Sequence, residues 1–186
     1  MRWCVFCGSA PGNDSRFVEY ATALGTALAR AGNELVYGGG RTGLMGAVAD
    51  AAVAAGGRVF GIIPQQLEDR EVAHRGISDL RIVGSMHERK ALMAELSDGF
   101  VALPGGFGTF EEFCEAVTWV QLGIHRKPCL LANLAGYYDP LVGQFDHGCE
   151  SGFISPANRE IVQVVTSLDA LLATVSRKTT AERILP

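Results

Sequence analysis

Long apolar runs and an excess of basic residues are both missing from this sequence of 186 residues. No apolar run approaches the ~20 residues that a membrane-spanning helix needs. The net charge is −4, so the chain lacks the basic surface that binds nucleic acid or anionic membranes. The apolar segment 1–7 is short and runs into glycine and acidic residues, which favours a first β-strand over a signal peptide. We therefore expect a cytoplasmic protein that binds neither membranes nor nucleic acid.

Cysteines are few and odd in number. The five cysteines lie at 4, 7, 114, 129 and 149, and such a scattered set indicates reduced thiols in a cytosol. Cys4 and Cys7 have the C-x-x-C spacing of some redox and metal sites. Residues three apart in a strand point to opposite faces, however, so this pair is poorly placed to chelate or to bridge. We predict two structural thiols, no metal site and no cofactor.

Short β-rich runs alternate with longer helical periods along the chain. Strands are predicted at 2–7, 34–37, 58–63, 80–83, 100–103, 128–132 and 162–165, and helices at 15–31, 44–55, 86–96, 109–122, 140–150 and from 168 onward. The polar segment 64–78 is the longest predicted loop. Alternation of this kind, with nearly continuous apolar strands, predicts an α/β fold: one Rossmann-like domain with a mostly parallel sheet and helices on both faces. The domain is expected over 1–176, with a polar, frayed tail at 177–186.

Three strand-to-helix turns are rich in glycine. Their sequences are CGSAPG at 7–12, GGGRTGLMG at 38–46 and PGGFGTFEE at 104–112. Because each follows a strand of a predicted parallel sheet, we expect all three at the edge where such folds bind ligands. Glycine lets the backbone approach a ligand closely, and the N–H groups of a helix N-terminus bind phosphate. One such turn could be purely structural, whereas three at one edge predict a phosphate site.

Neither of two common nucleotide motifs is complete. The turn at 38–46 has no clean G-x-G-x-x-G, because the glycines with that spacing, at 38, 40 and 43, belong to a longer glycine run, and the next strand ends at Ile63 and Pro64 without the acidic residue of a dinucleotide site. There is also no G-x-x-x-x-G-K-[ST] sequence, which excludes a P-loop. The phosphate is therefore expected to be that of a mononucleotide or a sugar phosphate.

The turn at 104–112 carries two acids into its helix. Glu111 and Glu112 could simply complement the helix dipole. Carboxylates beside a phosphate site are unfavourable, however, unless they act on a cationic centre. The oxocarbenium-like C1 of a sugar during glycosidic cleavage is such a centre. The acids therefore favour glycosidic chemistry.

A basic cluster begins the helix after the fourth predicted strand. Arg89 and Lys90 close the segment SMHERK at 85–90. The dipole disfavours cations at this end of a helix, so an anionic group is expected nearby. Arginine suits a two-pronged contact with phosphate or carboxylate. The alternative is an ordinary solvated first turn.

Together these segments resemble the LOG ("lonely guy") family of cytokinin-activating phosphoribohydrolases, often labelled "possible lysine decarboxylase". The segment 104–112 fits the PGGxGTxxE signature, and 86–90 and 38–46 fit two companion blocks. The resemblance extends from Cys4 to about Leu172. It implies a homodimer that needs no cofactor. It also implies hydrolysis of the N-glycosidic bond of adenosine-type 5′-monophosphates, N6-modified ones included, to free base and ribose 5-phosphate.

The resemblance also implies roles for particular residues. Arg89 and Glu112 correspond to the catalytic residues of the family. The implied substrate contacts are Glu71, Lys90, Gly105, Gly106, Phe107, Gly108, Thr109, Phe110 and Glu111, with Ser9 and Gly43 as further candidates for phosphate or ribose contacts. A departure lies near Glu95, where the family more usually has a basic or amide residue, and this leaves the preferred base open.

The expected mechanism follows from these assignments. The 5′-phosphate would bind the N–H groups of 105–109, with the Thr109 hydroxyl as a further donor. Glu112 would stabilise the developing cation at C1 and orient or deprotonate the attacking water. Arg89 would hold substrate hydroxyls or Glu112 in line. The proton for the departing base would come from Glu71 or from solvent.

Three other functions are weighed against this one. Amino-acid decarboxylation needs an electron sink such as pyridoxal phosphate on a lysine, and none of Lys90, Lys127 and Lys178 has a suitable setting, so we reject it. A non-catalytic nucleotide or cofactor carrier on the same fold would need the glycine turns but not the pair of Arg89 and Glu112. An NAD(P)-dependent oxidoreductase is disfavoured by the incomplete fingerprint, which lacks its acidic residue, and it would retain a dinucleotide on purification.

Overall fold

The strands of the protein form one parallel sheet. The computed structural model describes residues 1–68 and 73–176. Its strands are β1 (Arg2–Phe6), β2 (Glu34–Tyr37), β3 (Val59–Pro64), β4 (Asp79–Val83), β5 (Gly99–Ala102), β6 (Cys129–Ala132) and β7 (Val162–Val165). Every neighbouring pair in this sheet is parallel, as the alternating sequence pattern predicts.

Helices connect the strands. They are α1 (Ser15–Arg30), α2 (Gly43–Ala54), α3 (Gln65–Glu68), α4 (Met86–Leu96), α5 (Phe107–Gln121), the 3₁₀ turn η1 (Leu134–Gly136), α6 (Asp139–Glu150), α7 (Pro156–Arg159) and α8 (Leu168–Ser176). None of the helices within 1–68 and 73–176 has the length and hydropathy of a membrane span.

The strand order places β1 at the centre of the sheet. The order is β4-β3-β2-β1-β5-β6-β7, so the chain runs outward from β1 to β4 and then returns to the other side of β1 with β5. Cys4 of β1 pairs with Val36 of β2 on one side and with Phe100 of β5 on the other. In open α/β sheets the crevice beside such a reversal binds ligands. The turns after β1, β2 and β5 therefore meet at the expected place.

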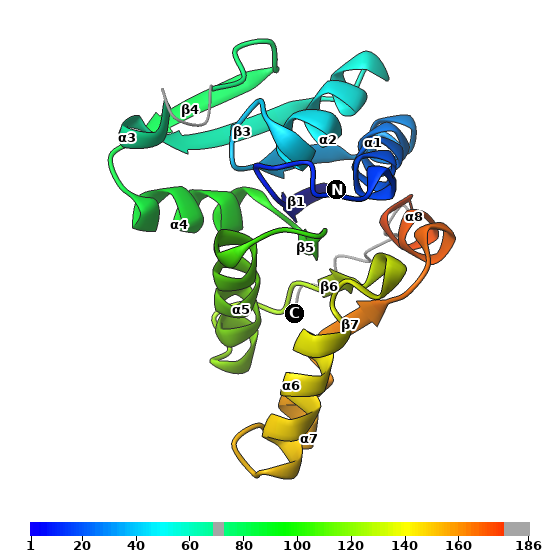
Figure 1. The fold of residues 1–186 in the computed structure, drawn as a ribbon. Helices are drawn as coiled ribbons and strands as arrows, with labels where there is room; N and C mark the ends of the chain where they lie inside the picture. The colour runs from blue at the N-terminus through cyan, green and yellow to red at the C-terminus, as the bar shows by residue number, and fades with distance from the viewer. Residues whose placement is uncertain (69–72, 177–186) are drawn as a thin grey trace, which may run out of the picture.

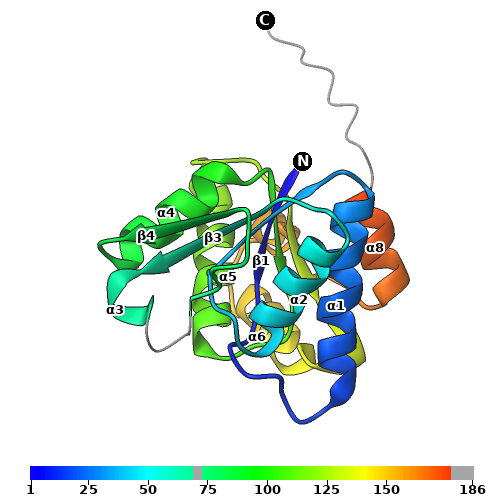
Figure 2. The same ribbon diagram turned by 90° about the horizontal axis from the view of Figure 1, so that it is seen from above.

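Helices cover both faces of the sheet, as predicted. The helices α1, α2 and α8 lie on one face (Figures 1 and 2). Their buried side chains include Leu24, Val48 and Leu171. The helices α4 and α5 lie on the other face (Figure 1), and there Met93 and Phe113 are buried. The strands β1, β2, β5 and β6 contribute alternate residues to the two cores, because successive side chains of a strand point to opposite faces.

The two cysteines of the C-x-x-C spacing follow this alternation. Cys7 lies in the core beneath α1 and α2, and Cys4 lies in the core beneath α4 and α5. Both are buried free thiols. Their expected separation onto opposite faces is confirmed.

Close packing of α1 on α2 depends on one glycine. A Cβ atom at Gly25 would lie 2.2 Å from the carbonyl oxygen of Val48, so no larger residue fits there without moving a helix. The two helices thereby form the tightest helix pair on this face, and they hold the turns at their N-terminal ends beside β1.

The predicted elements are all present, with boundaries shifted by at most two residues. Two short α-helices were not predicted, nor was the 3₁₀ turn η1. The first, α3, begins in the polar segment 64–78, and its four residues are too few to show a helical period. The second, α7, has Ser155 as its N-cap and Pro156 at its first position. These residues are typical of a helix start, but a prediction based on hydrophobic periodicity does not use them. The predicted domain end at 176 stays a prediction, because 177–186 lie outside the described residues.

Candidate active site

A cleft of about 210 Å³ lies at the carboxyl ends of β1 and β5. Its wall is formed by Cys7, Gly8, Ser9, Met45, Arg89, Gly106, Phe107, Gly108, Thr109 and Glu112. All three glycine-rich turns and the basic cluster of α4 therefore contribute to one cavity. This gathering is the arrangement that the sequence pattern predicts for a phosphate-binding edge.

Gly8 joins the three turns to one another. Its carbonyl oxygen accepts hydrogen bonds from the backbone N–H groups of Leu44 and Met45, at 3.0 and 3.3 Å. Its own N–H donates to the carbonyl oxygen of Pro104, at 3.1 Å. The first N–H groups of α2 are thus used inside the protein, in holding the turn after β2 against the turn after β1.

The N-terminus of α5 faces the cleft. Gly106 is the N-cap of this helix, and it has no side chain with which to cap the N–H groups of the first turn. Such groups carry partial positive charge and bind anions. Thr109 is 3% exposed and lines the cleft. A Cβ atom at Gly105 would lie 2.1 Å from the Thr109 hydroxyl oxygen, so glycine at 105 lets that hydroxyl fold over the turn.

The guanidinium of Arg89 is buried and held by backbone carbonyls. Nε donates to the carbonyl oxygen of Ile62 at 3.1 Å, and Nη2 donates to that of Gly38 at 2.9 Å. These carbonyls lie at the carboxyl ends of β3 and β2. A Cβ atom at Gly38 would lie 2.1 Å from Nη2, so glycine is required where the guanidinium rests on the turn.

The start of α4 explains how Arg89 reaches this position. The Ser85 hydroxyl accepts from the N–H of Glu88 at 3.1 Å, and the Glu88 carboxylate accepts from the N–H of Gly84 at 2.8 Å. This reciprocal arrangement resembles a capping box, and the S-x-x-E sequence encodes it. The helix therefore begins at Met86 and places Arg89 in its first turn, over the ends of the strands.

Arg89 and Glu112 form the ionic part of the cleft. Nη1 of Arg89 lies 4.0 Å from Oε1 of Glu112, and the two side chains are 6% and 11% exposed. A charge pair this far from water interacts more strongly than one on the surface. The expected anionic neighbour of the basic cluster is thus a carboxylate of α5.

Cys7 lies in the wall beside this pair. Burial raises the pKa of its thiol, and the Glu112 carboxylate raises that pKa further. A thiol with a raised pKa stays protonated at neutral pH, and only the thiolate is an effective nucleophile. Cys7 therefore contributes an uncharged wall to the cleft.

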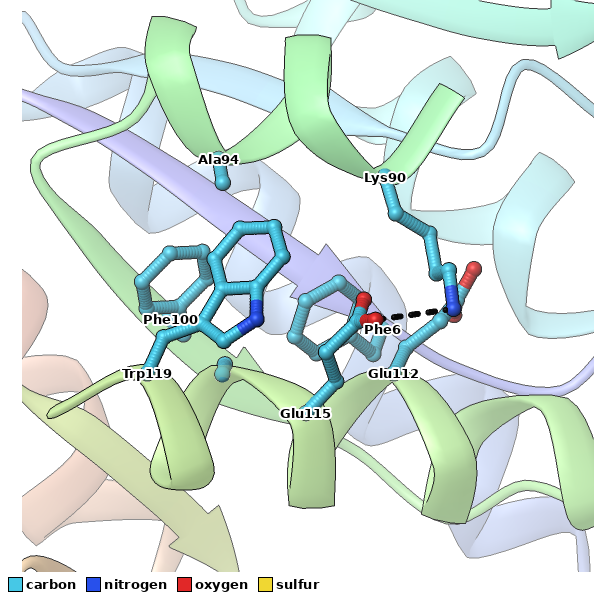
Figure 3. Close-up of a pocket in the computed structure, with 8 residues that line it drawn as sticks. Phe6, Lys90, Ala94, Phe100, Glu112, Glu115 and Trp119 are labelled. Atoms are coloured by element: carbon cyan, nitrogen blue, oxygen red, sulfur yellow. Dashed lines mark hydrogen bonds and ion pairs between the residues drawn. The ribbon is translucent and has the colours of Figure 1, made fainter. Parts of the chain in front are cut away.

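Lys90 does not line the cleft. Its ammonium group forms an ion pair with Glu111 of α5 and another, at 3.1 Å, with Glu115 of the same helix. Figure 3 shows the pair with Glu115. Burial lowers the pKa of Lys90, but the hydrogen bonds to the two carboxylates outweigh it, and the pKa ends above its ordinary value. Lys90 is thus a charged link between α4 and α5.

A second, smaller cavity lies behind Glu112. It has a volume of about 10 Å³, enough for about one water molecule. Figure 3 shows its apolar side, where Phe6, Phe100 and Trp119 lie together. Glu112 borders both cavities, so its side chain lies between the polar cleft and this apolar space.

The structure brings only part of the predicted residue set together. Arg89, Glu112, Gly106, Phe107, Gly108, Thr109 and Ser9 line the cleft. Phe110 packs its ring against Tyr138 instead, and Gly43 packs with φ of +59° against the backbone of Ser9. Glu71 lies outside the described residues.

Three cleft residues were not among the predicted site residues. Met45 comes from the third position of α2, and Cys7 and Gly8 directly follow the last residue of β1. Gly8 belongs to a predicted glycine-rich turn, whereas the residue types of Met45 and Cys7 do not suggest phosphate chemistry. They could have been predicted only from their position in or beside the glycine-rich turns, because such residues lie at the same edge of the sheet as the turns.

The described residues give neither a cluster of metal ligands nor a lysine in the cleft. Within 1–68 and 73–176, no three His, Cys, Asp or Glu side chains gather so that they could hold a metal ion. Of the two lysines in these ranges, Lys90 is paired as described and Lys127 donates to the carbonyl oxygen of Ala94, at 2.6 Å. Neither lysine lines the cleft, which agrees with the rejection of lysine-bound pyridoxal chemistry.

Comparison with known proteins gives the family. A family model described as "Possible lysine decarboxylase" matches residues 45–175. The cytokinin riboside 5′-monophosphate phosphoribohydrolase of Rhodococcoides fascians is 48% identical over 172 residues, which cover 92% of this chain and 87% of the relative. LOG1 of Arabidopsis thaliana, which is also named a cytokinin riboside 5′-monophosphate phosphoribohydrolase, is 47% identical over 92% of this chain and 80% of its own length. The chain belongs to the LOG family.

Proteins with low sequence identity to this chain and with other names have the same fold. The molybdenum cofactor carrier protein of Chlamydomonas reinhardtii superposes with a TM-score of 0.70 over 94% of both chains, at 21% identity. Identity this low shows a common fold alone. Arg89 and Glu112, the pair to which the sequence resemblance assigns the catalytic roles, lie together in the cleft of this chain.

Proposed function

We propose that the protein is a hydrolase of adenosine-type nucleoside 5′-monophosphates, N6-modified ones included, which releases the free base and ribose 5-phosphate. The observation that carries the proposal is the buried pair of Arg89 and Glu112 in a cleft bordered by the N-terminus of α5. Relatives about half identical to this chain are named phosphoribohydrolases of cytokinin riboside 5′-monophosphates. The turn 104–112, read as PGGxGTxxE, would supply both the phosphate contacts and the carboxylate.

The phosphate and the sugar would be bound at different parts of the cleft. The N–H groups of Gly106 to Thr109 and the Thr109 hydroxyl would bind the 5′-phosphate. The ribose would then lie in the cleft beside the first turn of α5, with its C1 atom toward Glu112. Lys90, Glu111 and Phe110 do not line the cleft, so in this proposal they support α5 rather than contact the phosphate.

The reaction breaks one bond and forms another. The C1–N9 bond lengthens, and its electron pair leaves with the base while positive charge develops on the sugar. Glu112 stabilises that charge and accepts a proton from the water that attacks C1. The base takes up a proton from Glu71 or from solvent. Arg89 is held in place before substrate arrives, so it can keep Glu112 in line at little further energetic cost.

The test is base release from AMP and from N6-isopentenyl-AMP, followed by chromatography. Glu112→Gln should lower kcat by about 10²- to 10⁴-fold, the usual contribution of general acid–base catalysis. Glu115→Gln is the matched control, because it removes a carboxylate from the same helix without touching the cleft, and it should stay within about threefold of wild type. Full activity of Glu112→Gln would overturn the assignment of the carboxylate.

The same assay separates the rival functions. If wild-type protein binds AMP tightly and releases no base, the hydrolase proposal fails and a carrier is favoured. The ratio of kcat/KM for the two nucleotides measures the base preference that the departure near Glu95 leaves open.

We also propose that the working unit is a homodimer, as the family resemblance implies, and that it is cytoplasmic and binds no nucleic acid, as the cysteine content and the net charge of −4 predict. Large apolar side chains are exposed at Leu122, Ile124 and Phe153, and a partner chain could cover them. Light scattering should then give twice the chain mass of 19.8 kDa. Cell fractionation should recover the protein with cytoplasmic markers, and a mobility-shift assay should show no retarded DNA or RNA.

A further inference from the structure

Two tyrosines of the segment between β6 and α6 bind the turn after β5. The hydroxyl of Tyr137 donates a hydrogen bond to the carbonyl oxygen of Gly105. The hydroxyl of Tyr138 donates to the carbonyl oxygen of Leu103, at 2.6 Å. Because β5 and β6 are neighbours in the sheet, the segments after them lie at the same edge.

The Tyr137 bond fixes the direction of one peptide unit. The carbonyl of Gly105 and the N–H of Gly106 belong to the same planar peptide, which is trans, so they point in opposite directions. Tyr137 holds the carbonyl end away from the cleft. The N–H end is thereby directed to the side where Gly106 lines the cleft, and it becomes one of the donors at the N-terminus of α5.

Aromatic packing keeps the Tyr137 hydroxyl in place. The ring packs edge-on against Phe17 of α1, with centroids 5.6 Å apart, and against Tyr138, at 4.9 Å. Tyr138 in turn packs against Phe110 of α5, at 6.1 Å. Tyr137 itself is 36% exposed, so its hydroxyl contributes little to the core and the fold does not depend on it.

We propose that Tyr137 is a positioning residue for the phosphate of the substrate: it orients the 105–106 peptide so that the N–H of Gly106 can bind the phosphate oxygens. The inference rests on the proposed function, in which this turn receives the 5′-phosphate. Tyr137 acts through the backbone and does not itself touch the substrate. Its effect therefore falls on binding of the phosphate rather than on the chemical step.

Tyr138 provides a matched control within the same turn. Its hydroxyl binds the carbonyl of Leu103, whose peptide nitrogen belongs to Pro104. Proline has no N–H, so this peptide has no donor to direct at a ligand. Removing either hydroxyl takes one hydrogen bond from the turn, but only the loss at Tyr137 frees a peptide that carries an N–H.

The experiment compares Tyr137→Phe with Tyr138→Phe and wild type. In calorimetric titrations with ribose 5-phosphate, Tyr137→Phe should weaken binding about three- to tenfold, the range that one hydrogen bond covers. KM for AMP should rise by the same factor, with kcat within about twofold of wild type. Inhibition by adenosine, which lacks the phosphate, should not change. Tyr138→Phe should bind ribose 5-phosphate within about twofold of wild type, although it should unfold at lower temperature.

The outcomes distinguish this inference from the proposed function. Unchanged binding of ribose 5-phosphate by Tyr137→Phe would overturn the inference. Equal losses in both variants would overturn it too, since the hydroxyls would then only stiffen the turn. If wild type binds ribose 5-phosphate but releases no base from nucleotides, the hydrolase proposal fails while the titration still decides the role of Tyr137. If wild type does not bind ribose 5-phosphate, the phosphate assignment and the inference fail together.

Discussion

The turn after β2 and the turn after β5 are both rich in glycine and both lead into a helix, but their glycines lie in different surroundings. In the turn after β2, a Cβ atom at Gly38 would meet Arg89 at 2.1 Å, and one at Gly46 would meet the carbonyl oxygen of Arg41 at 2.0 Å. In the turn after β5, Gly105 is also packed, with a Cβ 2.1 Å from the Thr109 hydroxyl oxygen, but Cβ atoms at Gly106 and Gly108, which line the cleft, would meet no atom within 4 Å. Glycine allows close packing in the first turn and leaves the cleft open in the second.

The helix that follows each turn shows the same difference. Two N–H groups in the first turn of α2, those of Leu44 and Met45, donate to the carbonyl oxygen of Gly8. The N-terminus of α5 has Gly106 as its cap and lines the cleft. One turn therefore holds the site together, and the other is placed to receive the ligand. Similar glycine spacing in a sequence can thus encode different roles, and substitution by alanine tells them apart.

The largest expected effect is that of Gly46→Ala. The added methyl would collide with a backbone carbonyl that cannot move without shifting the turn, so we expect a loss of about 3 kcal/mol or more in the free energy of unfolding. Urea denaturation measures it. Gly143→Ala in α6, where a Cβ has open space, should instead stabilise by up to about 1 kcal/mol. An unchanged midpoint for Gly46→Ala would contradict the packing role.

Gly38→Ala should have an intermediate effect on stability and a large one on activity. The methyl would displace the guanidinium of Arg89 from the carbonyls that hold it. We expect a loss of about 1–3 kcal/mol in stability. Misplacement of the group that orients Glu112 should lower kcat about a hundredfold. Base release from AMP measures the second effect, and wild-type kcat in this variant would show that Arg89 does not depend on the turn.

Gly108→Ala should have the smallest effect on stability and should act on binding alone. The position is helical and open, so alanine should leave the free energy of unfolding unchanged or raise it by up to about 1 kcal/mol. The methyl would project beside the cleft and should raise KM for AMP by about three- to tenfold, which corresponds to about 1 kcal/mol. Parallel kinetic and denaturation measurements check both. A marked loss of stability would mean that both turns serve packing.

Much of the fold could be predicted from local pattern. The apolar runs 34–37 and 162–165 and the S-x-x-E start of α4 are read from neighbouring residues, and the structure has these elements with the same limits. The order of the strands, with β1 between β2 and β5, depends on contacts between distant segments that no local pattern contains.

The candidate site could be predicted only in part for the same reason. Glycines and acids at 104–112 indicated the turn that borders the cleft. The direction of Lys90 depends on carboxylates one and two turns along a different helix, and the contact of Tyr137 with Gly105 joins residues 32 positions apart. Such contacts are set by which strands are neighbours, so they become visible only once the sheet order is known.

The central place of β1 ties ligand binding to the order in which the chain is assembled. β1 precedes the other strands of the described sheet in the chain, yet one of its two partners in the sheet is β5, about a hundred residues later. The cleft needs both, so a growing chain would become able to bind nucleotide only after Glu112 has emerged and β5 has paired with β1. Nucleotide at about a hundred times its Kd would then add about 2.7 kcal/mol to the free energy of unfolding. That gain would show that β1 and β5 have paired.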